Sequence, residues 1–324
     1  MKKPALLAAA AATLALVAGA TAPALAAVPD VHLQPGQLTR GADATVPHVE
    51  GNAVVDGSFT ARFKNAGGVR LLGTSGGDYV VATWSDTTTT TPRVVRVTPT
   101  GDRTTILSGL PVWEMTMSHD GAQIVYPKVK YRAKETRTKV YSATDGSLLV
   151  QRTFDGFAWT LDADAGTFVM SASQPQRTFS WNTGTDRVTR LTDRAAYAAS
   201  IAADRLAWMS KDPYRGGCSI VSRLSDTTAR VWKSCDQAVW EFSPDGSRMA
   251  TVYILSDGLG PGQVQLRKGG GRIVAKYHTY YFGAVLWETD TTPLMLTHGK
   301  RKTAWVRCDV GTCERASGLT RTQL

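Results

Sequence analysis

Cysteine and histidine are scarce in this sequence, and their spacing excludes the common kinds of metal site. The 324 residues include four cysteines and five histidines. No two histidines have the H-x-H or H-E-x-x-H spacing of metal-binding pairs. We therefore predict neither a metal nor another cofactor. Charged residues make up 20% of the chain and hydrophobic residues 43%, a balance that excludes a largely disordered protein.

A long apolar run occurs only near the N-terminus. Residues 6–20 are uncharged and follow Lys2 and Lys3, and Ala24-Leu25-Ala26 matches the A-x-A cleavage site of a secretory signal peptide. The run is shorter than the roughly 20 residues of a membrane-spanning helix. We expect residues 1–26 to be removed by cleavage and the mature protein to be secreted, without a membrane span. Loss of the two lysines lowers the net charge from +10 to +8.

All four cysteines lie in the last third of the chain: Cys218, Cys235, Cys308 and Cys313. In an exported protein an even number of cysteines favours disulfides. Four cysteines allow three pairings, and proximity favours Cys218–Cys235 and Cys308–Cys313, each across a strand–turn–strand segment. The alternative is a four-thiolate zinc site, whose close C-x₂₋₄-C spacing is approached only by the second pair.

A weak repeat of 40 to 45 residues organises the chain. The clearest copy is Trp240–Gly246 (WEFSPDG), and it is echoed by Met115–Gly121 (MTMSHDG) and Trp159–Asp164 (WTLDAD). An aspartate marks the turn of each copy: Asp78, Asp120, Asp164, Asp204, Asp245 and Asp290. Repeats of this length, built on strands and turns, are typical of propeller blades.

Residues 242–246, Phe-Ser-Pro-Asp-Gly, resemble the motif of the TolB-like and WD40-like β-propeller repeats. The resemblance extends by spacing over residues 67–318. It implies an all-β fold, a β-propeller of four-stranded antiparallel blades. Six blades account for the six aspartates, and seven are the alternative, because residues 48–65 also alternate like strands.

The strands of one blade are expected at residues 238–242, 248–254, 263–267 and 272–277. Residues 193–211 contain seven alanines and favour a helix by propensity, but the repeat predicts strands there. Residues 27–47 are expected to form a flexible leader, and residues 48–324 a single propeller domain.

Residues that enter the first strand of each blade are expected to gather around one mouth of the central channel. They are Trp113, Phe157, Tyr197, Gln237, Tyr281 and Phe282. A mouth lined by aromatic side chains suits a peptide or glycan ligand. The recurring tryptophans Trp159 and Trp240 are instead expected to pack between blades.

The clearest charge feature is an alternating series of Lys128, Lys130, Arg132 and Lys134. In an extended segment these four side chains lie on one side. This arrangement predicts binding to an anionic polymer such as a cell-wall polymer. The alternative is a solvated blade edge on which lysines prevent strand-to-strand aggregation.

Together these patterns predict an exported, monomeric binding or scaffolding protein with no catalytic residues and no specific nucleic-acid ligand. The alternative is a propeller lyase or glycan hydrolase with dispersed site residues. Three or more histidines or carboxylates that converge at the channel mouth would favour the enzyme.

Overall fold

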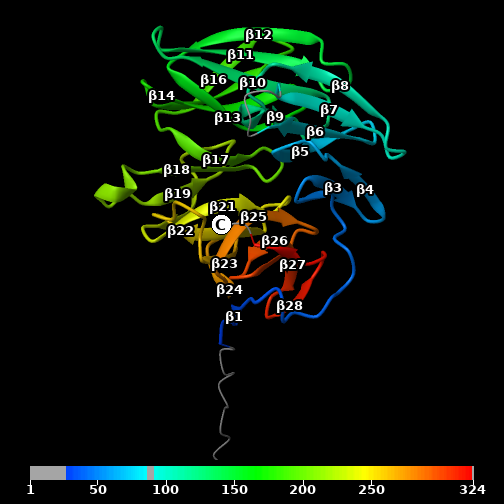
Figure 1. Cartoon of the computed structure of the whole chain (residues 1–324). Coiled ribbons are helices and arrows are strands. Elements are labelled where there is room, and N and C mark those ends of the chain that lie inside the picture. The colour runs from blue at the N-terminus through cyan, green and yellow to red at the C-terminus, as the bar shows by residue number, and fades with distance from the viewer. Residues whose placement is uncertain (1–26, 86–90, 323–324) are drawn as a thin grey trace, which may run out of the picture.

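The computed structural model describes residues 27–85 and 91–322, so the expected signal peptide lies outside the described residues. Within these ranges the strands form seven sheets arranged as the blades of a propeller (Figure 1). The colour in Figure 1 runs around the ring from blue to red, so the first and last blades lie next to each other. The prediction of a β-propeller is confirmed. The blade number is seven, the stated alternative to six, because residues 48–62 form a blade of their own.

The blades follow one another in chain order. Blade 1 contains β2 (His48–Glu50), β3 (Ala53–Asp56) and β4 (Phe59–Arg62). Blade 2 contains β5 (Gly68–Ser75), β6 (Asp78–Trp84), β7 (Arg93–Val97) and β8 (Arg103–Ser108). Blade 3 contains β9 (Thr116–Met117), β10 (Gln123–Lys130), β11 (Glu135–Ser142) and β12 (Leu148–Asp155), preceded by the short 3₁₀ helix η1 (Val112–Glu114). Blade 4 contains β13 (Phe157–Asp164), β14 (Thr167–Ser173), β15 (Arg177–Asn182) and β16 (Arg187–Thr192).

The second half of the ring repeats this plan. Blade 5 contains β17 (Ala196–Ser200), β18 (Arg205–Met209), β19 (Ser219–Ser222) and β20 (Arg230–Ser234), with η2 (Pro213–Arg215) between β18 and β19. Blade 6 contains β21 (Gln237–Phe242), β22 (Arg248–Tyr253), β23 (Gln263–Lys268) and β24 (Ile273–His278). Blade 7 contains β25 (Tyr281–Trp287), β26 (Pro293–His298), β27 (Lys302–Asp309), β28 (Thr312–Arg315) and β29 (Thr320–Arg321). The strands expected for blade 6 agree with those observed to within one residue at each end.

The Ser-x-Asp-Gly turns of blades 3 and 6 have the same hydrogen bonds, which confirms the repeat. The hydroxyl of Ser118 donates to Asp120 at 2.6 Å, and that of Ser243 donates to Asp245 at 2.9 Å. Each serine hydroxyl also accepts the backbone N–H five residues later at 2.9 Å. These side-chain contacts add to the backbone bonds from Ser118 to Gln123 and from Ser243 to Arg248 that close each hairpin.

The alanine-rich residues 193–211 form strands β17 and β18, not a helix. Ala196 and Ala207 are buried in the core between blades, where the small side chains allow neighbouring sheets to approach. Packing around the ring thus overrides helix propensity, which is a weak preference when tertiary contacts oppose it.

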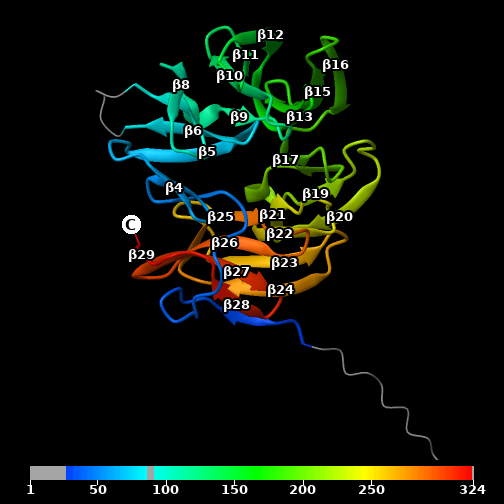
Figure 2. The ribbon, with the colours of Figure 1, turned by 90° about the vertical axis from the view of Figure 1, so that its right-hand side faces the viewer.

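The segment before blade 1 differs from the expected flexible leader. Strand β1 (Asp30–His32) pairs in parallel with β24 and adds a fifth strand to blade 6. Leu33 is fully buried in the core, and the backbone of Gly41 and Ala44 bonds to Arg315 and Ala316 in blade 7. Figure 2 shows the blue segment as it crosses these two blades.

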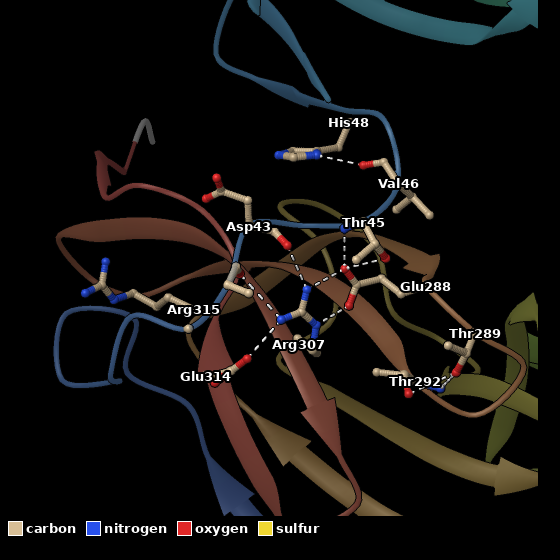
Figure 3. A network of polar contacts seen from close by, with 12 residues as sticks. Asp43, Thr45, Val46, His48, Glu288, Thr289, Thr292, Arg307, Glu314 and Arg315 are labelled. Carbon is tan, nitrogen blue, oxygen red and sulfur yellow. Dashed lines mark hydrogen bonds and ion pairs between the residues drawn. The ribbon is translucent and has the colours of Figure 1, made fainter. Parts of the chain in front are cut away.

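A buried ion pair holds this N-terminal segment against blade 7 (Figure 3). The guanidinium of Arg307 donates to both oxygens of Glu288, with Nη2 2.7 Å from Oε1. Arg307 also donates to the carbonyl oxygen of Asp43 at 3.0 Å, and Glu288 accepts the backbone N–H of Thr45 at 2.7 Å. Burial raises the pKa of Glu288, but the bonds from Arg307 and Thr45 outweigh it, so the pKa lies below its ordinary value.

The cysteines are paired as expected, Cys218 with Cys235 and Cys308 with Cys313. Cys308 and Cys313 face each other across the β27–β28 hairpin. In the described part of the chain no helix is long and apolar enough to cross a membrane.

Candidate functional site

Two of the six expected mouth residues lie together, at a cavity between blades 3 and 4. Trp113 on η1 and Phe157 at the start of β13 both line this cavity, whose volume is about 320 Å³. Trp159, Met115 and Val129 complete the apolar walls. The side chain of Trp113 is 57% exposed, so it is available for contact with a ligand. We call this cavity the aromatic pocket.

The other four predicted mouth residues belong to the core. Tyr197 is hydrogen-bonded through its hydroxyl to Ser219 and accepts the backbone N–H of Val239 at 3.1 Å. The side-chain oxygen of Gln237 accepts the hydroxyl of Thr251. Tyr281 is stacked on His298 with ring centroids 4.0 Å apart, and Phe282 is buried in the core. These side chains tie strands and blades together instead of lining the aromatic pocket.

The wall of the aromatic pocket is held in place by Arg70, which the sequence analysis did not single out. Its guanidinium reaches from β5 in blade 2 and donates to the carbonyl oxygens of Val112 at 2.8 Å and Trp113 at 3.0 Å. It therefore fixes the 3₁₀ turn that presents Trp113. Burial lowers the pKa of Arg70 and raises that of Glu114, which also lines the pocket.

Some of the recurring tryptophans pack in the core, and another lines the aromatic pocket. Trp240 packs against the core formed by blades 6 and 7, as expected, and Trp287 packs against the same core. Trp159 lines the aromatic pocket. The position of a tryptophan in the repeat does not show whether it packs in the core or lines the pocket, because Trp159 and Trp240 both lie on inner strands.

The predicted basic series lies beside the aromatic pocket, but it is not one extended segment. Strand β10 ends at Lys130, and the chain turns over residues 131–134, so Arg132 and Lys134 lie in the hairpin turn. Lys130 forms an ion pair with Glu135. Tyr131 at the tip is 76% exposed and its ring contacts Phe157 at a centroid distance of 5.5 Å. The turn joins the basic series to the aromatic pocket.

A second cluster of titratable groups lies at the opposite end of the inner strands. His119 in the blade 3 turn contacts Asp162 of blade 4, Nε2 to Oδ1 2.7 Å. Asp162 also accepts the backbone N–H of Ile201 in blade 5 at 2.6 Å. Glu241 is accessible to solvent, and desolvation by the protein around it together with the nearby Asp162 carboxylate raises its pKa to about 7.

β-Bulges explain how Asp162 and Glu241 reach this cluster. The pairing of β13 with β14 shifts between Thr160 and Asp162, and that of β21 with β22 shifts between Val239 and Glu241. A bulge changes the side to which the following residues point. The sequence shows no pattern that marks these bulges.

No metal centre is indicated in the part of the chain that the structure describes, where no three His, Cys, Asp or Glu side chains are grouped to hold an ion.

Comparisons with known proteins agree on the fold alone. No family model and no curated protein matches the chain. The β-propeller domain of the Trilobed protease from Pyrococcus furiosus, described as having an open velcro topology, is similar with a TM-score of 0.61 at 10% identity, over 86% of this chain and 97% of that one. Pyrococcus horikoshii acylaminoacyl peptidase is similar with a TM-score of 0.61 at 11% identity, over 86% of this chain and 52% of that one. TolB from Acinetobacter baumannii is a further structural neighbour, with a TM-score of 0.44 at 14% identity over 69% of this chain and 61% of that one. The chain thus has the fold of a β-propeller, a fold that hosts many unrelated functions.

Proposed function

We propose that this protein is an exported, non-catalytic binding module that holds an anionic polymer, such as a cell-wall glycan, at the aromatic pocket and the β10–β11 turn. One observation carries the proposal. The aromatic side chains Trp113 and Phe157 and the basic residues of the turn, predicted separately, are joined through the contact of Tyr131 with Phe157. Sugar rings offer apolar faces to aromatic side chains, and their acidic groups pair with lysine and arginine.

The turns between second and third strands extend this basic surface. Equivalent turns of a propeller lie on one face, because the blades repeat the same strand order around the ring. On this face blade 3 contributes Arg132 and Lys134. Blade 5 contributes Lys211 and Arg215, of which Arg215 lies 3.8 Å from Asp212, and blade 7 contributes Lys300 and Arg301; all six basic residues are exposed. Charges of one sign on one face add their potentials and attract a polyanion.

The proposal is tested by binding of the protein to isolated anionic cell-wall polymer over a series of salt concentrations. Affinity should fall steeply with salt, because each neutralised charge on the polymer releases a counterion. Replacement of Lys128, Lys130, Arg132 and Lys134 by glutamine should weaken binding and flatten its salt dependence. Trp113→Ala should weaken binding with little change in the salt dependence, because it removes an apolar contact only.

A matched control removes four exposed charges from the opposite face. These are Arg187, Arg230, Lys268 and Arg272, which lie at the turns between third and fourth strands and are replaced by glutamine. The control has the same net charge as the first variant and should bind the polymer with the affinity of wild type. Equal loss of binding in both variants would show that only net charge matters, and would reject a localised site.

The alternative, a lyase or hydrolase, is favoured by the convergence of His119, Asp162 and Glu241. A carboxyl group with a pKa of about 7 can act as a general acid or base near neutral pH. The Asp162 carboxylate, however, already accepts two backbone N–H groups and contacts His119. Cleavage of a wall glycan by wild type that is abolished in Glu241→Gln would establish this alternative in place of the binding module.

A further inference from the structure

Blade 1 lacks an inner strand. The inner strands of consecutive blades, β5, β9, β13, β17, β21 and β25, lie against one another around the ring. Among the described residues blade 1 contributes only β2, β3 and β4. Figures 1 and 2 place blade 1 between blades 2 and 7.

Two contacts identify the three strands of blade 1 as the second, third and fourth of a normal blade. The carboxylate of Asp56, the last residue of β3, accepts the hydroxyl of Tyr79 at 2.8 Å, at the end where β6 begins. Phe59, where β4 begins, stacks on the same Tyr79 ring with centroids 4.7 Å apart, whereas residues 62–66 at the end of β4 share a cavity with Trp84, where β6 ends. Strand β4 therefore runs in the direction of β6, as the fourth strand of an antiparallel blade must when β6 is the second. The vacant position is on the inner side of β2.

A cavity of about 470 Å³ occupies this vacant position. Its walls come from blades 7, 1 and 2, and its apolar side chains are Val49, Leu71, Leu286, Leu296 and Trp305. We call it the seam cavity. Its size and apolar lining are those of a ligand site.

The edge of β2 that faces the seam cavity has backbone groups directed into it. The backbone N–H of Phe63 donates to the carbonyl of Asn52. The backbone N–H and C=O groups of even-numbered residues in β3 therefore point to β4, and those of odd-numbered residues point to β2. Val49 pairs opposite Val54 and therefore points its N–H and C=O away from β3. Its carbonyl accepts Trp305 Nε1 at 2.9 Å. Within the described residues its N–H has no hydrogen-bond partner.

We propose that an extended peptide of a partner protein binds along β2 in the seam cavity and completes blade 1 as its inner strand. Strand addition of this kind takes affinity from main-chain hydrogen bonds and specificity from pockets for alternate side chains. The cavity wall on blade 7 and the wall on blade 2 are both apolar, so the peptide has apolar side chains on both faces. This inference is independent of the polymer site proposed above.

The charges at the seam cavity favour an acidic residue in the same peptide. Arg321 lines it and is exposed, whereas the guanidinium of Arg70, which also lines it, is bound to the carbonyl oxygens of η1. Glu50, the carboxylate in the lining, contacts His48 at 3.1 Å. Arg321 is therefore the exposed cation with which an acidic side chain of the peptide can pair.

The inner strand of blade 4 provides a suitable probe, because it fills the equivalent position in its own blade. A fluorescein-labelled synthetic peptide that copies Phe157–Asp164 contains phenylalanine, tryptophan and leucine together with two aspartates. Fluorescence anisotropy should show saturable binding to the full-length mature protein. Hydrogen exchange at the Val49 amide should slow on binding. No saturable binding up to about 1 mM would overturn the proposal.

Two variants and one control peptide locate the binding site. Ala284→Trp places a large side chain in the cavity and should weaken binding about tenfold or more. Val49→Pro removes the N–H that faces the cavity and gives an independent test if the first variant unfolds. A peptide with prolines at alternate positions cannot form the strand ladder and should not bind.

Further outcomes distinguish a partner peptide from the end of this chain, and the seam cavity from the polymer site at the β10–β11 turn. The quadruple glutamine variant of the β10–β11 turn should bind the probe as wild type does, whatever its effect on polymer binding. Binding that is seen only after deletion of residues 323–324 would overturn the proposal, because the chain's own end would then be the occupant. Unchanged affinity in both folded cavity variants would also overturn it.

Discussion

Asp245 donates its backbone N–H to the carboxylate of Asp290 in the next blade at 3.1 Å, and this contact repeats the link from His119 to Asp162 three blades earlier. Asp245 and His119 belong to equivalent turns, yet one uses its backbone and the other its imidazole. In both cases a carboxylate of the following blade accepts the bond. Neighbouring blades are thus joined by polar contacts at the turns as well as by their apolar faces.

The stabilising effect of His119 should depend on pH. The hydrogen bond to Asp162 is the main cause of the raised pKa of His119. A raised pKa in the folded state stabilises the protein below the unfolded pKa of 6.5, and this contribution is lost as pH rises through the folded pKa. His119→Gln should therefore destabilise the protein in mild acid and have little effect at alkaline pH.

The size of this effect should stay below about 1 kcal/mol, because the imidazole is 64% exposed and solvent screens it. Chemical unfolding of wild type and variant between pH 5 and about 9 measures the difference. A difference that is constant across this range would refute a role for protonated His119.

Loss of the Arg307–Glu288 pair should destabilise the protein strongly. Arg307→Met leaves the Glu288 carboxylate, which is 3% exposed, without its partner. An unpaired buried charge costs about 3–5 kcal/mol. Arg190→Gln is the matched control, because it breaks an exposed ion pair with Asp193 and should change the free energy of unfolding by less than about 0.5 kcal/mol.

The same substitution should release the N-terminal segment, because Arg307 also bonds to the carbonyl of Asp43. Limited proteolysis should then cut within residues 34–47 in Arg307→Met before it cuts the blades. Equal protection of this segment in wild type and variant would show that β1 and Leu33 suffice to hold it.

The two disulfides should contribute unequally to stability. Cys218 and Cys235 are 17 residues apart, whereas Cys308 and Cys313 are five apart. In the chain-entropy model the longer loop is worth about 3 kcal/mol and the shorter one about 2 kcal/mol. Paired replacement by serine, followed by chemical unfolding, tests this order, and a larger loss from the shorter loop would contradict the entropic explanation.

Cleavage after Ala26 should produce the mature protein. The carbonyl of Pro29 accepts the N–H of Lys276, so contacts with blade 6 begin three residues after the expected site. Mass spectrometry of the secreted protein should find Ala27, or a residue within two of it, at the N-terminus. Secreted protein that retains Met1 would refute the signal peptide.

Local sequence determined the blades but not how the ring closes. The Ser-x-Asp-Gly turns, the repeat length and the alternating strands predict the hairpins, because each depends on contacts within about forty residues. The cysteine pairs were predictable for the same reason. Blade 1 and the N-terminal segment depend on contacts between the two ends of the chain, for which the sequence has no local signal.

For the candidate sites too, local sequence predicted some features and tertiary contacts decided the others. The repeat predicted that Trp113 and Phe157 stand at strand entrances, and alternation drew attention to the basic series, because both patterns are local in the sequence. The tertiary structure alone decided that Tyr197, Gln237, Tyr281 and Phe282 belong to the core, since neighbouring blades cover them. It also decided the supporting role of Arg70 and the vacancy beside β2, because both depend on packing between blades that are distant in the chain or at its two ends.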